Sequence, residues 1–300
     1  MSVFFLFIDG VGVGSKSDHN PLADRGLKSF SHFTEGDGLH SGIAPVLKNS
    51  KLYLPLDANL DVEGLPQSGT GQASLFSGVN ASKIAGKHFG PYPYSKTKFL
   101  LKQRSLFHQA IEIGFTPHFL NAYPDIFFKK SEKIKRWTCT TLMAKSAGVR
   151  LNRLEDVVDE NALTAEIIQN AWREMLHLEV PEITPEMGGD RVIRALESYD
   201  LVLYEYYLTD KAGHEKDPER AGKILEILDR FLIQVMKNLK DGDTLVISSD
   251  HGNIEDLSIK THTRNPVPLF VKGDIEPFIN ATSILDVTPA ILETLKRDRK

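Results

Sequence analysis

Short, continuously apolar runs dominate this sequence and restrict the folds open to it. The runs are rich in β-branched and aromatic residues, which is typical of strands buried on both faces of a sheet. They are VFFLFID (3–9), PHFLNAY (117–123), DLVLYEYYLTD (200–210), DTLVISSD (243–250) and VPLFVKG (267–273). Helical patterns lie between them, and this alternation predicts a mostly parallel sheet covered on both faces by helices.

The clearest helical pattern begins at Asp217 and Pro218, a typical cap followed by a first-turn proline. Apolar residues then recur on one face, which predicts a long helix packed on the core. A second helix is predicted over residues 103–114, closed by Gly114. Residues 10–65 are rich in Gly, Asn, Asp and Ser and are predicted to be mostly loop.

Residues 125–187 contain helical patterns but no apolar run of the strand type. We therefore predict a three-layer αβα sandwich whose catalytic core comprises residues 1–124 and 188–300, with residues 125–187 inserted as a small, mainly helical cap. The 300 residues, with 41% hydrophobic content, are sufficient to bury a core of this size.

Composition excludes several classes of protein. The net charge of −4 and the pI of about 6.2 provide no basic field for nucleic acid or an anionic membrane. The apolar opening run is short and includes Asp9, so it predicts a strand and not a signal peptide. The single cysteine, Cys139, excludes intrachain disulfides and thiolate metal clusters. We expect a soluble cytoplasmic protein, whose oligomeric state the sequence does not indicate.

Carboxylates and histidines lie at the ends of several predicted strands. Ligand sites in parallel sheets form at the carboxyl ends of strands, so these groups converge if the strands are neighbours. Together they are the mixed oxygen and nitrogen ligands of a two-metal site, which can hold the attacking and departing oxygens of a phosphate ester. The candidates are Asp9, Asp210, His214, Asp250, His251 and His262.

The segment LPQSGTGQASLFSG (65–78) provides a nucleophile. Ser68 lies at a glycine-broken turn before a helical pattern, where backbone N–H groups can meet an anion and a metal can lower the pKa of its hydroxyl. Thr70 shares this turn and is the competing nucleophile. A serine here could also simply cap the helix.

Basic residues follow the nucleophile segment. Lys83, Lys87 and His88 could bind substrate oxygens, or they could be ordinary solvated loop residues. The basic segment KKSEKIKRW (129–137) is similarly either a lid over an anionic substrate or a solvated helix face.

Five motifs occur in one order along the chain: IDGVG, SGTGQ, TDKAGH, SSDHGN and HTRNPVP. Together they resemble the alkaline phosphatase superfamily of metalloenzymes, and most closely its branch of cofactor-independent phosphoglycerate mutases and phosphopentomutases. The resemblance covers residues 2–14, 60–90 and 195–295. It implies two divalent ions, Mn or Zn, and Ser68 as the nucleophile. The ligands it implies are Asp210, His214 and His262 for one ion, and Asp9, Asp250, His251 and Ser68 for the other.

The chain departs from those mutases in the region that binds their substrate. They carry a long insertion after the nucleophile segment, whereas the stretch from Gly90 to Asp200 is too short to hold it. Asn121-Ala122-Tyr123 also stands where they place Glu-Lys-Tyr. A small cap gives water access to a phosphoserine, so we expect hydrolysis of a small phosphorylated metabolite. A phosphomutase acting on a small sugar or glycerate phosphate, a phosphodiesterase and a metal-binding pseudoenzyme are the alternatives.

Overall fold

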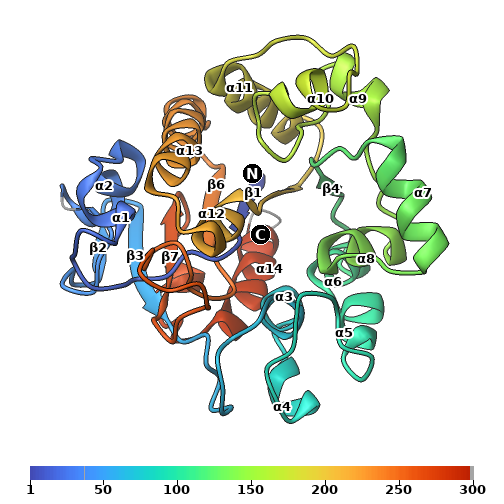
Figure 1. The fold of residues 1–300 in the computed structure, drawn as a ribbon. Coiled ribbons are helices and arrows are strands. Elements are labelled where there is room, and N and C mark those ends of the chain that lie inside the picture. Colours follow the sequence, from blue (N-terminus) through green and yellow to red (C-terminus); the bar gives the residue numbers. More distant parts are fainter. Residues whose placement is uncertain (37, 298–300) are drawn as a thin grey trace.

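The computed structural model describes residues 1–36 and 38–297. Within this part a seven-stranded sheet lies at the centre, in the order β2-β3-β7-β6-β1-β5-β4 (Figure 1). The strands are β1 (Val3–Ile8), β2 (Val46–Lys48), β3 (Lys51–Leu56), β4 (Pro117–Phe119), β5 (Leu201–Tyr206), β6 (Thr244–Ser248) and β7 (Val267–Lys272). β1 pairs in parallel with β5 and β6, and β4 with β5, whereas β7 runs antiparallel to β6 and β3. The mostly parallel sheet is confirmed.

Helices cover both faces of the sheet (Figure 1). One layer contains α3 (Ser68–Ser77), α4 (Ala81–Ala85), α5 (Lys98–Gln103), α6 (Leu106–Glu112), α8 (Cys139–Ser146), η1 (Glu276–Phe278), η2 (Ile284–Asp286) and α14 (Val287–Arg297). The other contains α1 (Pro21–Asp24), α2 (Lys28–Thr34), α11 (Pro185–Leu196), α12 (Leu208–Glu215) and α13 (Pro218–Asn238). The predicted three-layer αβα sandwich is therefore confirmed, as is the long helix after its Asp217 cap.

The central strand β1 shows why the sheet needs two layers. Successive side chains of a strand point to opposite faces. Phe5 and Phe7 pack in one hydrophobic cluster, whereas Phe4 and Leu6 pack in the other, and all four are fully buried. A strand that is apolar at every position must be covered on both sides.

The segment predicted as a cap is helical, but it does not stand apart from the core. Its helices are α7 (Asp125–Ile134), α8, α9 (Leu154–Val158) and α10 (Asn170–Glu174). Val157 and Trp172 belong to a small separate cluster, whereas Cys139 and Met143 of α8 pack in the main core. The boundaries of core and cap stay a prediction, and residues 298–300 of the predicted core range lie outside the described residues.

Two strand predictions are too long. The run predicted over 200–210 ends as a strand at Tyr206, and Asp210 lies in α12. The turn into that helix is fixed by Thr209, whose hydroxyl donates to the backbone oxygen of Asp9 at 2.5 Å. The run predicted over 117–123 is a strand only as far as Phe119, and isolated bridges follow it.

The prediction of mostly loop over residues 10–65 is wrong for β2 and β3. β3 contains Pro55, which cannot donate to a ladder. Pro55 lies opposite Pro268 of β7, at a point where the pairing of β3 with β2 has already ended. β6 likewise no longer pairs with β7 at Pro268. Each missing N–H therefore faces away from a ladder.

Candidate metal centre

The seven predicted ligands lie at one end of the sheet, but on different elements. Asp9 follows β1, and Asp250 and His251 follow β6. Ser68 is the first residue of α3, and His262 lies in the loop before β7. The remaining two, Asp210 and His214, lie one helical turn apart on α12 and therefore on the same face.

Two groups of ligand atoms meet around His251. Its Nε2 atom lies 3.0 Å from Ser68 Oγ, 3.3 Å from Asp9 Oδ1 and 3.5 Å from Asp250 Oδ2. One compact group, with ligand atoms within 4.8 Å of one another, is Asp9, Asp250 and His251. A second group, equally compact, is Asp210, His251 and His262.

The other two histidines meet at Asp210. Nε2 of His214 lies 3.3 Å from Asp210 Oδ2, and Nε2 of His262 lies 3.6 Å from Oδ1. The two Nε2 atoms are 3.2 Å apart. The rings of His251 and His262 stack with centroids 3.8 Å apart, so the two groups share one continuous site.

All three histidines present the same nitrogen to the centre. Nδ1 of His214 and of His262 each lies 2.7 Å from a backbone oxygen, of Lys260 and Pro66 respectively. Nδ1 of His251 lies 3.4 Å from the oxygen of Gly252. A carbonyl can only accept, so Nδ1 carries a proton and, wherever the ring is neutral, Nε2 keeps its lone pair. This is the arrangement of histidines that bind a metal.

Buried carboxylates at this site lack partners. Asp9 Oδ1 and both side-chain oxygens of Asp250 are buried and make no hydrogen bond. Burial, and then the neighbouring Asp250 and Asp210, raise the pKa of Asp9 well above its usual range. Burial and Asp210 raise the pKa of Asp250 to about 7. Divalent cations would relieve this repulsion and fill the orphaned lone pairs, so the residues present suit metal ions.

The pKa values of His251 and His262 point to the same conclusion, whereas His214 is protonated near pH 7 without a metal. Burial lowers the pKa of His251 and of His262 to about 4, so both are neutral near pH 7 and free to act as ligands. A hydrogen bond to Asp210 raises the pKa of His214 to about 9. Burial opposes ionisation of Asp210, but His214 and His251 together hold its pKa well below the usual range.

Comparison with known proteins assigns the chain to a family. Residues 1–299 match the family model of the Metalloenzyme superfamily. The chain belongs to this superfamily. The resemblance inferred from the five motifs is confirmed at this level.

Curated relatives of this superfamily member match only part of it. A 2,3-bisphosphoglycerate-independent phosphoglycerate mutase of Desulforudis audaxviator is 33% identical over 124 residues. The match covers 38% of this chain and 24% of that enzyme. A second such mutase, from Methanosarcina barkeri, is 33% identical over 129 residues, 38% of this chain and 25% of that enzyme. The match thus spans about a quarter of the length of these relatives.

Solved structures match over the whole chain. Alkaline phosphatase from the Antarctic bacterium TAB5 has a TM-score of 0.58 and 11% identity, covering 98% of this chain and 97% of that one. The PH0037 protein of Pyrococcus horikoshii has a TM-score of 0.58 and 12% identity, covering 100% and 98%. At such identities the likeness shows the fold alone.

The structure separates the two candidate nucleophiles. Ser68 Oγ faces the metal ligands at His251, whereas Thr70 is fully buried with its hydroxyl turned to the adjacent loop. Thr70 Oγ1 accepts from the N–H of Phe89 at 3.1 Å and lies 3.5 Å from the backbone oxygen of Gln67. Among the two, only Ser68 has a contact with the predicted ligands.

The predicted substrate contacts are not grouped around the ligands. Lys83 is exposed on α4. His88 is half-buried, with its ring nitrogens 3.2 Å from Ser82 Oγ and 3.2 Å from the oxygen of Val62, so it anchors its own loop. Lys87 is exposed, and its ammonium lies over the ring of Tyr94, 5.3 Å from the centroid. Substrate binding by Lys83, Lys87 and His88 stays a prediction.

Several polar residues beside the ligands were not predicted. Gln72 donates to Asp9 Oδ2 at 3.1 Å. Glu205 is buried on β5, where it accepts from the hydroxyl of Thr140 at 2.7 Å. Burial raises the pKa of Glu205 to about 7, and Asp250 also raises it. A glutamate inside the apolar run LVLYEYY was the signal, because a charge in a buried strand needs a partner.

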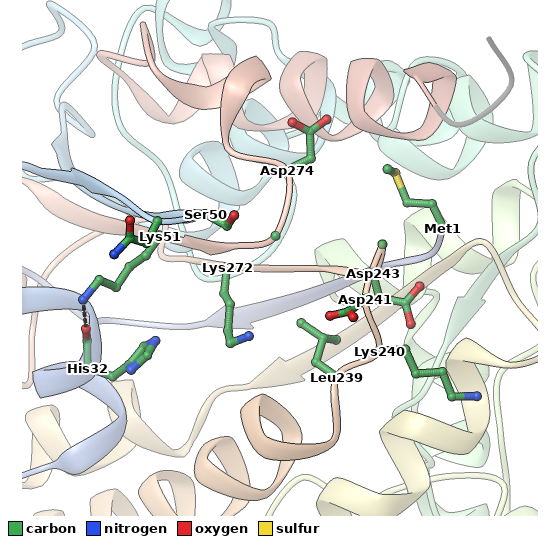
Figure 2. Close-up of a pocket in the computed structure, with 13 residues that line it drawn as sticks. Met1, His32, Ser50, Lys51, Leu239, Lys240, Asp241, Asp243, Lys272 and Asp274 are labelled. Atoms are coloured by element: carbon green, nitrogen blue, oxygen red, sulfur yellow. Dashed lines mark hydrogen bonds between the residues drawn. The ribbon is translucent and has the colours of Figure 1, made fainter.

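A pocket of about 570 Å³ lies at the opposite end of the sheet (Figure 2). It is lined by residues beside the amino ends of β1 and β6, including Met1 and Asp243, and by the end of β7 at Lys272. Figure 2 shows Lys272 between His32 and Leu239. None of the predicted ligands lines this pocket.

No helix among the described residues combines the length and apolarity needed to cross a membrane.

Proposed function

We propose that this chain is a phosphoryl-transfer enzyme that depends on two divalent metal ions and hydrolyses a small phosphate ester, with Ser68 as the nucleophile. The observation that carries the proposal is the convergence of three histidine Nε2 atoms on Asp9, Asp250 and Asp210, where Asp9 Oδ1 and both side-chain oxygens of Asp250 lack partners. The family assignment and the mutase and phosphatase names among similar proteins support it.

The ligands divide between two ions as the motifs imply. Asp210, His214 and His262 would hold one ion, while Asp9, Asp250, His251 and the Ser68 oxygen would hold the other. Mixed carboxylate and imidazole ligands suit Mn or Zn. When bound, the two ions neutralise the phosphate and make the serine hydroxyl and a water molecule more acidic.

Ser68 and the helix that it begins position the nucleophile and the phosphate for the reaction. Ser68 Oγ forms a bond to phosphorus while the ester oxygen leaves, and water then displaces the serine and releases phosphate. Because Ser68 begins α3, the free N–H groups of the first helical turn can face the phosphoryl oxygens. The helix thereby orients the anion as well as the nucleophile.

Two unpaired cations flank the nucleophile turn. Arg136 lies over the ring of Tyr92, 5.5 Å from the centroid, and Lys87 lies over Tyr94. The backbone of their loop packs against the first turn of α3, where the N–H of Thr70 donates to Phe89 at 2.9 Å. Neither Arg136 nor Lys87 has a carboxylate partner within the described residues. We propose that they attract anionic substrates, with Arg136 as the main contact.

Glu205 and Thr140 offer oxygen ligands for a further, harder cation. Both are buried, and the charge of Glu205 adds to the forces that raise the pKa of Asp9. Carboxylate and hydroxyl oxygens are the ligands that Mg²⁺ prefers. A solved structure of a variant of the TAB5 phosphatase has Mg bound in its M3 site. We propose Mg²⁺ for this position, in addition to the two ions above.

Hydrolysis of an aryl phosphate tests the proposal. The protein is freed of metal with a chelator, Mn or Zn is added back, and phosphate release is measured for wild type, Ser68→Ala and Thr70→Val. We expect metal-dependent release that Ser68→Ala lowers by roughly 10³-fold or more and that Thr70→Val largely keeps. Full activity in Ser68→Ala would contradict the assignment of the nucleophile.

Phosphomutase activity is the second candidate, because the curated relatives are mutases. A positional-isomer assay with small sugar and glycerate phosphates separates the two: isomer formation without net release of phosphate identifies a mutase. A cytoplasmic location likewise stays a prediction.

A further inference from the structure

Glu255 is a buried carboxylate that belongs to neither predicted ligand set. It lies in the loop after β6, shortly after His251, and only 1% of its surface is exposed. Its Oε2 accepts from the backbone N–H of Gly12 at 2.9 Å and of Asn253 at 2.7 Å. Its other oxygen, Oε1, accepts from the Asn265 side chain at 3.1 Å and from the hydroxyl of Thr263. Four donors thus surround one carboxylate.

These donors come from three different ligand-bearing loops. Gly12 belongs to the loop after Asp9, Asn253 to the loop that begins with Asp250 and His251, and Thr263 with Asn265 to the loop of His262. A fourth segment is reached through Asn253, whose Nδ2 donates to Asp210 Oδ1 at 2.7 Å and to its backbone oxygen at 3.2 Å. Glu255 therefore connects the loop after β1, the loop after β6 and the loop before β7. Through Asn253 it also reaches α12, but not the start of α3.

The backbone around Glu255 leaves no space for other side chains. A Cβ atom at Gly12 would lie 2.2 Å from Glu255 Oε1, and one at Gly252 would lie 2.1 Å from the same atom. Both distances are far below van der Waals contact. The two glycines thus allow two loops to close directly on the carboxylate, which explains the glycine at position 12 in IDGVG and the glycine at position 252 in SSDHGN.

We propose that Glu255 is the positioning residue of the metal centre: by accepting from all three loops, it fixes the separation of Asp9, Asp250, His251 and His262. It acts through the placement of its two acceptor oxygens. Outer groups that orient metal ligands typically change metal affinity or activity by about 10- to 100-fold when removed. The inference rests on the metal site of the proposed function, but it does not depend on which reaction the site catalyses.

Two substitutions of Glu255 separate positioning from charge. In Glu255→Gln, the amide oxygen can keep the bonds from Gly12 and Asn253, while its NH₂ can donate to the Thr263 hydroxyl and to a rotated Asn265 amide. Glu255→Ala removes all four bonds. We expect Zn or Mn affinity, measured by calorimetry on the metal-free protein, to fall about 10- to 100-fold in Glu255→Ala. Glu255→Gln should stay within roughly threefold of wild type, since it retains the acceptor and donor pattern.

A matched control distinguishes this role from general stability. Asp156 is also a buried carboxylate that accepts a backbone N–H, from Arg153 at 2.8 Å, but it lies in α9. Asp156→Ala should lower the melting temperature and leave metal affinity unchanged. Should Glu255→Ala fail to fold, Thr263→Val removes the bond to Glu255, together with the one that the hydroxyl accepts from the N–H of Asn265 at 3.2 Å, and keeps the shape of the side chain. We expect it to weaken metal binding by about three- to tenfold.

The outcomes are distinct. Wild-type metal affinity in folded Glu255→Ala, or in Thr263→Val if only that variant folds, would overturn the proposal. An equal loss in Glu255→Gln and Glu255→Ala would assign the effect to charge, which also overturns it. If the wild-type protein binds metal but hydrolyses no phosphate ester, the proposed function fails while the role of Glu255 is still supported by the affinities.

Discussion

At the carboxyl end of the parallel strands, Asp9, Asp250 and Glu205 are buried together without a fixed positive charge beside them. At the amino end, the pocket of Figure 2 is wide and its charged groups are mostly paired. There Lys240 pairs with Glu197 at 2.7 Å, and Lys51 with Glu35 at 3.3 Å. Most charges that line the pocket therefore have partners, whereas the buried carboxylates of the metal centre need ions from outside.

This contrast shows that unsatisfied charge marks a functional site better than pocket size does. Strongly shifted pKa values cluster where burial and like charges have been arranged for chemistry. Exposed ion pairs such as Lys240 with Glu197 contribute little to stability and are common on protein surfaces.

The largest expected effect comes from matched substitutions at the two ends. Asp250→Asn keeps the shape of the side chain but removes a ligand charge, so turnover should fall by roughly 10³-fold or more with loss of one bound ion. Asp243→Asn, in the pocket, keeps the acceptor that holds the N–H of Ser2 at 2.8 Å and should leave turnover unchanged. Both are measured as metal content and phosphate release. Equal losses of bound metal and turnover in the two variants would contradict the contrast between the two ends of the sheet.

A smaller effect is expected at the rim of the metal centre. Arg136→Ala removes an unpaired guanidinium, so KM for an ester that carries a second anionic group should rise about tenfold. KM for a neutral aryl phosphate should rise less. Lys133→Ala, an exposed cation of α7 three residues before Arg136, serves as the control. An unchanged KM for both esters in Arg136→Ala would show that this cation is only a solvated surface residue.

Buried charge at the metal centre also predicts a pH-dependent stability. The pKa of Glu205 is raised from 4.5 to about 7 in the folded protein. The contribution of Glu205 to the free energy of unfolding is therefore highest below pH 4.5, where Glu205 is protonated in both states. This contribution falls as the pH rises to about 7, because the unfolded protein ionises this group more easily than the folded protein does. In Glu205→Gln, the metal-free protein should gain roughly 1–3 kcal/mol over wild type at pH 8 and little at pH 4.

Urea unfolding with a chelator present measures this difference at each pH. Asp200→Asn provides a control, since Asp200 accepts from Thr116 at the other end of β5, away from the buried cluster. A gain for Glu205→Gln that is the same at pH 4 and pH 8 would contradict the assignment of the buried charge. Added Mg²⁺ should reverse the order of wild type and Glu205→Gln if the proposed third ion binds there.

The sequence was informative where chemistry follows the chain locally. The apolar runs placed Asp9 and Asp250 at strand ends, because a buried strand and its last residue are adjacent in sequence, and their alternation with helical patterns predicted the αβα order. Glu205 and Glu255 could not be placed in the same way. Their partners, Thr140 and Gly12, are far away along the chain and meet them only after the sheet has formed.

The missed strands β2 and β3 have a similar explanation. Whether Pro55 is tolerated depends on where the neighbouring strand ends, and a single sequence does not contain that register. Asp210 was placed on a strand because LVLYEYYLTD is apolar almost throughout. Only the contact of Thr209 with the backbone of Asp9 shows where the helix begins.

The smallest effect is expected in the pocket, where Lys272 lies directly opposite Lys51 in the pairing of β3 with β7. Like charges at such positions repel each other, and Lys272 has no ion pair within the described residues. Its charge therefore does not stabilise the fold. Lys272→Gln should therefore change the free energy of unfolding by less than about 0.5 kcal/mol, in the stabilising direction, with turnover unchanged. Chemical unfolding and the phosphate-release assay measure both. A loss of metal affinity or turnover in Lys272→Gln would mean that the two ends of the sheet are coupled, and the contrast between a satisfied pocket and an unsatisfied metal centre would no longer hold.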